Sequence, residues 1–183
     1  MLASTDGMLI LLLLLLASYA VGVVLPFCVP RKPQMQGMVG SVCACAASGI
    51  GIALGISGLV DSEPLMASVA SSIPLLAFAV RLDPLASFFV LTISLAGLAA
   101  SIYAMGYLKE FHGRVSVAAL AALTNAFLLS MTLVVIADNG FFFLIAWELM
   151  SLVSYFLVVT EHEKADVRYA GFFYLVMTHV GTA

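Results

Sequence analysis

Charged side chains are scarce in this chain of 183 residues: Asp, Glu, Lys and Arg together make up 9% of it, against about 25% in a typical soluble domain. Hydrophobic residues make up 63%, and the mean hydropathy is +1.17. A soluble protein could not cover its surface with so few charged groups. The composition therefore excludes an ordinary soluble fold and predicts a protein whose solvent is lipid.

The chain also lacks a surplus of basic residues and any recognisable cofactor motif. Seven Lys and Arg residues stand against ten Asp and Glu residues, a net charge of -3, which argues against a nucleic-acid partner. Its cysteines (Cys28, Cys43 and Cys45) lack the spacing of a zinc or iron-sulfur site and are interpreted as packing residues. Without GxGxxG, Walker A or haem-ligand histidine patterns, we expect no cofactor, no metal and no catalytic centre of the chain's own.

Long uncharged runs are abundant instead, and each of six is long enough to approach or cross about 30 Å of hydrocarbon. They predict an all-α transmembrane bundle forming a single domain over residues 1–183. Glycines in the second run predict close helix packing: Gly49, Gly51, Gly55 and Gly58. The six runs cover about residues 8–29, 35–60, 84–108, 115–137, 141–160 and 169–183.

A polar segment, residues 61–83, interrupts the runs and is predicted to lie outside the membrane. Its apolar stretch Leu75 to Leu82 indicates a strand, one arm of a hairpin or a surface-lying segment. Asp83 and Pro84 then have the pattern of a helix start, with Asp as the N-cap and Pro at the first helical position.

The basic residues alternate between the connections and so predict an orientation. One side of the membrane receives six of them and the other receives only Arg81. Since cytoplasmic loops are enriched in Lys and Arg, we expect the N-terminus outside, in a prokaryotic inner (cytoplasmic) membrane. The six are Arg31, Lys32, Lys109, Arg114, Lys164 and Arg168.

Glu148 is the acidic residue placed deepest in a predicted span, about 18 Å from Thr160 at the cytoplasmic end. An ionisable group at that depth is costly unless it is paired, hydrated or protonated, so a proton-transfer role is the first hypothesis. Ser151 and Tyr155 lie on the same face, with Ser154 nearby, and are candidate water ligands. The alternative is a neutral structural Glu whose neighbours only join helices.

His179 lies about 15 Å into the sixth run from Tyr169, at nearly the depth of Glu148. A carboxylate and an imidazole side by side can exchange a proton, which makes His179 a candidate relay, although a structural hydrogen-bonding role is the alternative. Further polar groups could hold a water chain, but helix-to-helix bonds are the favoured interpretation. These groups are Thr124, Asn125, Thr178 and Thr182.

Four segments resemble the antiporter-like membrane subunits of complex I and its relatives. They are Arg81-Leu-Asp-Pro-Leu-Ala-Ser-Phe-Phe, Tyr103-Ala-Met-Gly-Tyr107, Ala137-Asp-Asn-Gly and Trp147-Glu-Leu-Met-Ser-Leu-Val-Ser-Tyr-Phe-Leu157. The resemblance covers about residues 80–183, and the last segment is its most specific part. Within the family, the segments are most similar to hydrogenase-4 component B and the formate hydrogenlyase membrane subunit.

The resemblance implies a subunit of about fourteen helices built from inverted repeats. It also implies a Glu on the fifth helix, at the position of Glu148, paired with a Lys on a broken seventh helix that lies beyond Ala183. The chain is therefore expected to be an N-terminal fragment of a longer subunit, or a naturally short chain.

The function expected from the resemblance is proton translocation, in a non-redox membrane subunit of a complex I-like or hydrogenase-linked respiratory complex. The other membrane subunits of that complex would be its partners. The alternatives are a subunit of an Mrp-type Na⁺/H⁺ antiporter and a structural membrane scaffold without ion transport.

Overall fold

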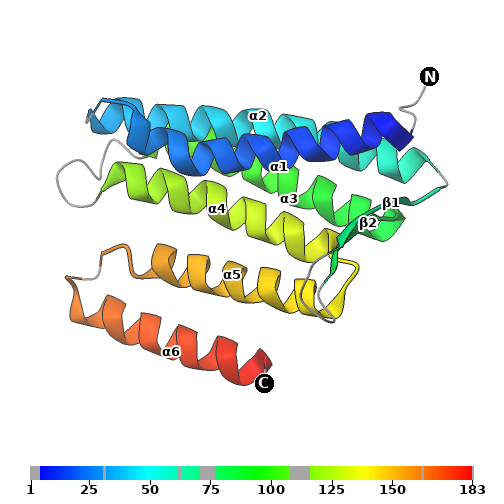
Figure 1. Cartoon of the computed structure of the whole chain (residues 1–183). Helices are drawn as coiled ribbons and strands as arrows, with labels where there is room; N and C mark the ends of the chain where they lie inside the picture. Colours follow the sequence, from blue (N-terminus) through cyan, green and yellow to red (C-terminus); the bar gives the residue numbers. More distant parts are fainter. Residues whose placement is uncertain are drawn as a thin grey trace.

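The computed structural model of the chain describes residues 5–30, 32–61, 63–70, 77–107, 116–161 and 163–182. Within these residues the helices run alongside one another, with a single two-stranded sheet at one end (Figure 1). The predicted all-α fold is confirmed, and of the structures considered for the polar segment the structure has the hairpin. In chain order the elements are α1 (Thr5–Cys28), α2 (Pro33–Val60), β1 (Leu65–Ala70), β2 (Ala77–Leu82), α3 (Pro84–Tyr107), α4 (Val117–Ile136), α5 (Gly140–Val158) and α6 (Ala165–Thr182).

Five of the described helices, α1 to α5, are long and apolar enough to cross a membrane. The protein is therefore an integral membrane protein. The sixth predicted span forms a helix, α6, but α6 is not among the candidate spans. Its 18 residues include Asp166 and Arg168 near its start and His179 near its end, and these polar groups lower its hydropathy. The prediction of six spans is thus confirmed for five.

Small residues let α2 approach its neighbours closely, because lipid provides no hydrophobic drive for helices to associate. Added methyl groups at Gly51 and Gly58 would lie 2.1 Å from the hydroxyl oxygens of Ser94 and Ser87 on α3. Gly49, by contrast, has no neighbouring heavy atom within 4 Å of such a group. Close packing is therefore confirmed for three of the four predicted positions, which are Gly51, Gly55 and Gly58.

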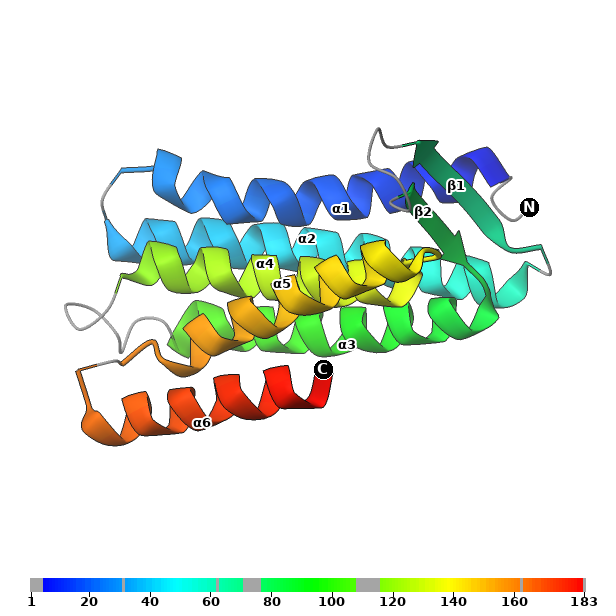
Figure 2. The same ribbon diagram turned by 60° about the horizontal axis from the view of Figure 1, so that its bottom comes forward.

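The hairpin pairs β1 and β2 in antiparallel register, from Leu65 opposite Leu82 to Ala70 opposite Ala77. The strand predicted near Leu82 is confirmed over 77–82, whereas β1 was not predicted; residues 71–76 lie outside the described part. The backbone N–H of Asp138, between α4 and α5, donates to the carbonyl of Ala79 at 2.9 Å. The hairpin is thereby tied to the end of the bundle where α1 begins (Figure 2).

The helix connections alternate between the two ends of the bundle, as the charge pattern predicted. Lys32, Lys164 and Arg168 lie near the α1–α2 and α5–α6 connections at one end, and Arg81 lies at the hairpin end (Figure 1). The other basic residues in the count, Arg31, Lys109 and Arg114, are outside the described residues. Which end faces the cytoplasm stays a prediction.

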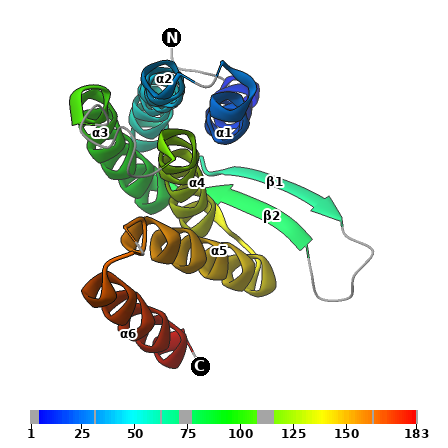
Figure 3. The same ribbon diagram turned by 90° about the vertical axis from the view of Figure 1, so that its left-hand side faces the viewer.

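Helices α5 and α6 lie to one side of the group formed by α1 to α4. In the end-on view of Figure 3, α4 separates α5 from α1 and α2, and α6 lies beyond α5. The main contacts agree, because α4 packs on α1 and α5, while α6 packs chiefly on α5. The seam between α5 and α6 is therefore at the edge of the bundle.

Candidate functional site

Helix α5 carries Glu148 and begins immediately after a short polar connection. The side chain of Asn139 caps the helix by accepting a hydrogen bond from the backbone N–H of Phe142 at 3.1 Å. Glu148 lies eight residues after Gly140 and ten before Val158. The carboxylate is therefore carried near the middle of a membrane-spanning helix, as the sequence predicted.

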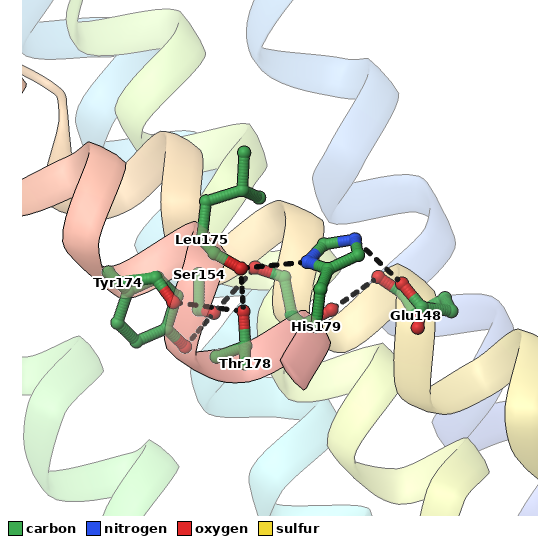
Figure 4. A network of polar contacts seen from close by, with 7 residues as sticks. Glu148, Ser154, Tyr174, Leu175, Thr178 and His179 are labelled. Atoms are coloured by element: carbon green, nitrogen blue, oxygen red, sulfur yellow. Dashed lines mark hydrogen bonds and ion pairs between the residues drawn. The ribbon is translucent and has the colours of Figure 1, made fainter. Parts of the chain in front are cut away.

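The structure brings Glu148 and His179 together across the seam between α5 and α6 (Figure 4). Glu148 Oε2 lies 3.3 Å from His179 Nε2. The two side chains remain 40% and 47% exposed, respectively, since the seam is at the edge of the bundle. The carboxylate thus has a titratable partner but is not enclosed by the described helices.

The second nitrogen of His179 limits where the protons of this pair can be. His179 Nδ1 lies 2.9 Å from the carbonyl oxygen of Leu175, one turn earlier in α6. A carbonyl oxygen only accepts, so Nδ1 carries a hydrogen when this contact is a hydrogen bond. Nε2 and the Glu148 carboxyl can then share one further proton, as either a neutral pair or an ion pair.

A second polar link joins the same two helices nearer their connection. The hydroxyl groups of Ser154 and Tyr174 lie 2.5 Å apart (Figure 4). Tyr174 was not predicted as a site residue. Antiparallel helices bring together residues that are equally far from their connection, and this rule relates Ser154 to Tyr174 as it relates Glu148 to His179. The signal was therefore present in the sequence.

Ser151 and Tyr155 lie on the face of α5 that carries Glu148, but the contacts of their side chains are with groups other than its carboxylate. The buried Ser151 hydroxyl donates to the backbone carbonyl of Glu148 at 3.0 Å. The Tyr155 ring packs edge-to-face with Phe156 and lies beside Gly171 of α6. Their roles as water ligands stay predictions.

The remaining polar candidates lie apart from this pair or bond within their own helix. Asn125, fully buried in α4, donates to the backbone carbonyl of Gly40 on α2 at 3.0 Å, which fits the favoured helix-joining interpretation. Thr124 and Thr178 donate to backbone carbonyl groups of their own helices. The side chain of Thr182 is outside the described part.

Comparison with known proteins identifies several relatives, although no protein-family model matches the chain. It is 35% identical over 133 residues to hydrogenase-4 component B of Escherichia coli, covering 73% of this chain and 20% of that protein. It is 32% identical over 163 residues to NADH-quinone oxidoreductase subunit L of Mycobacterium tuberculosis, covering 84% and 25%. An antiporter subunit of Staphylococcus saprophyticus is 36% identical over 101 residues, or 55% and 12%.

Among solved structures, the chain is similar to part of the membrane-bound sulfane sulfur reductase, an archaeal respiratory membrane complex. The TM-score is 0.70 at 15% identity, over 97% of this chain and 35% of that chain. This likeness shows a shared helix arrangement. The chain spans only about a fifth to a quarter of the length of hydrogenase-4 component B and of subunit L.

Proposed function

Because this chain is homologous to the N-terminal part of the antiporter-like membrane subunits of complex I and its hydrogenase and antiporter relatives, we propose that it serves in proton translocation. It does so within the membrane domain of a complex I-like or hydrogenase-linked respiratory complex, beside other membrane subunits. The observation that carries the proposal is the 3.3 Å contact between Glu148 and His179 near the middle of α5.

The proposed chemistry is the movement of the proton shared between the carboxyl and the imidazole. A positive charge that approaches Glu148 favours the carboxylate and drives the proton onto His179 Nε2 or away along the seam. Withdrawal of that charge returns the neutral pair. Glu148 is the switch and His179 the relay, while Ser151 and Tyr155 are the proposed water ligands.

The cost of the pair supports a role beyond packing. A charged group near the middle of a membrane helix costs about 3 kcal/mol or more in apolar surroundings. Two titratable groups that face each other there are unusual, and such groups commonly mark proton relays. Neutral hydroxyl groups can join the two helices without the cost of a charge in the membrane, as Ser154 and Tyr174 do nearer the α5–α6 connection.

Replacement of Glu148 with Gln tests the proposal. The amide is similar in size to the carboxyl group and can still form hydrogen bonds, but it has no acidic proton to transfer. Coupled proton movement in the assembled complex, measured with a pH-sensitive dye in vesicles, should be abolished while assembly is retained. Glu163→Gln is the matched control, since Glu163 is exposed in the α5–α6 connection. Proton movement that is unchanged in Glu148→Gln refutes the assignment.

The Staphylococcus relative favours a second candidate function, that of an Mrp-type Na⁺/H⁺ antiporter subunit. Gene neighbours distinguish the two: hydrogenase or quinone-reductase subunits support the respiratory assignment, and small antiporter subunits support the other. Proton movement that requires a Na⁺ gradient, and needs no electron donor, would establish the antiporter.

A membrane scaffold without transport is the remaining alternative. In a scaffold, the Glu148 carboxyl keeps one protonation state throughout the working pH range. In the proposed relay, its infrared band changes with pH, and the change disappears in Glu148→Gln. A band that stays constant supports the scaffold.

A further inference from the structure

A groove lies between α3, α4 and α5 at the hairpin end of the bundle, far from the α5–α6 connection. It has a volume of about 440 Å³. Val134 and Val135 of α4, Phe89 of α3 and Phe143 of α5 are among the residues that line it. The groove is thus lined mostly by apolar side chains from three helices.

Charged residues stand at one end of the groove only. They are Arg81 at the end of β2, Asp83 at the start of α3, and Asp138 between α4 and α5. The membrane-spanning parts of α3, α4 and α5 begin or end at these positions. The charged end therefore lies at the level of the lipid headgroups, and the apolar walls extend into the hydrocarbon.

The one positively charged residue that lines the groove, Arg81, fits a phosphate group. Arg81 Nε lies 3.9 Å from Asp83 Oδ2, and about two-fifths of each side chain is exposed, so the pair is loose and open to a ligand. The N-termini of α3 and α5 lie at the same end, but the side chains of Asp83 and Asn139 already cap them, which leaves Arg81 as the group for a phosphate. A guanidinium group attracts phosphate and matches its geometry.

The negative charges fit an ammonium group beside that phosphate. Asp83 uses Oδ1 to cap α3, accepting from the N–H of Ala86 at 2.8 Å. The backbone of Asp138 is held beside β2, the strand that carries Arg81, by its N–H bond to Ala79, and Asp138 lines the same groove. The groove thus presents both signs of charge beside its apolar lining residues.

We propose that this groove binds a zwitterionic phospholipid with a primary ammonium headgroup, of the phosphatidylethanolamine class. Arg81 holds the phosphate, and Asp138 accepts hydrogen bonds from the ammonium. One acyl chain lies along Val134, Val135 and Phe89. This site is separate from the proposed proton pair and does not depend on it.

The lipid preference can be measured on the unmodified chain. The protein is reconstituted in vesicles of equal phosphatidylethanolamine, phosphatidylcholine and phosphatidylglycerol, extracted in mild detergent and analysed by native mass spectrometry. Phosphatidylethanolamine should be enriched about threefold or more among lipids that remain bound, because phosphatidylcholine has no N–H donor for Asp138. Equal retention of the three lipids, or a preference for phosphatidylglycerol, overturns the proposal.

Two variants separate the two halves of the headgroup site. Arg81→Gln should reduce bound phosphatidylethanolamine about fivefold, since it removes a charge-assisted contact with the phosphate. Asp138→Asn should instead abolish the preference over phosphatidylcholine. Lys164→Gln, at the opposite end of the bundle, is the control and should change neither value.

Other occupants give distinct results. Retention that is unchanged in Arg81→Gln, at unchanged helical content by circular dichroism, indicates loosely surrounding lipid and overturns the proposal. Loss of the bound lipid in a longer form of the chain that carries further helices shows that protein segments fill the groove, and it also overturns the proposal.

Discussion

Replacing Gly51 with Ala should destabilise the bundle, although Ala is the better helix former. The added methyl group would lie 2.1 Å from Ser94 Oγ, 3.1 Å from Ser94 Cβ and 3.3 Å from Leu15 Cδ1. Ser94 is buried and Gly51 faces it on the adjacent helix, so either a side chain or a helix must shift. Overpacking of this kind costs about 1–3 kcal/mol.

Gly49→Ala is the matched control on the same helix. Its methyl group meets no heavy atom within 4 Å, so this variant only gains helix propensity, worth about 1 kcal/mol. Both variants share that gain. The difference between their free energies of unfolding therefore isolates the contact with Ser94 and Leu15, and we expect it to be about 1–3 kcal/mol.

The assay is reversible unfolding of the purified chain in mixed micelles, followed by circular dichroism as the fraction of denaturing detergent increases. Removing the nearest atom with Ser94→Ala should recover about half or more of the loss in the double variant, because the next contact is already 3.1 Å away. Equal stabilities for Gly51→Ala and Gly49→Ala would refute the reasoning, since they would mean that α2 and α3 are not in close contact at this point.

Two smaller predictions concern the polar links between helices. Tyr174→Phe removes the hydroxyl that meets Ser154 and should destabilise the α5–α6 pairing by about 0.5–1.5 kcal/mol, seen as faster amide hydrogen exchange in α6 while α1 to α4 stay protected. Ser154→Ala should give the same result, and exchange that is unaltered in both variants contradicts the link. Asn125→Leu removes the buried bond to Gly40 and should lower the unfolding free energy by about 1 kcal/mol or more, whereas a stability gain in the same unfolding assay contradicts the assigned geometry.

The sequence by itself determined the membrane class, the helices and the place of the hairpin. Each membrane helix must satisfy its own backbone groups in lipid, so a long apolar run already implies a helix. The start of α3 could also be predicted from the local sequence, because Asp83 caps the backbone N–H of Ala86, three residues later. The depth of Glu148 followed from counting residues along α5. All of these features depend on neighbours in the sequence.

Only the tertiary structure decided which side chains meet. Residue counting brought Glu148 and His179 to similar depth, but their 3.3 Å contact also depends on the rotation of α6 about its axis. Ser151 lies on the face of α5 that carries Glu148, yet its hydroxyl donates to the backbone carbonyl of Glu148 and not to the carboxylate. Strand β1 was missed because its pairing with β2 is a contact between distant segments. Rotation and pairing are set by packing between elements, and no pattern within one element records them.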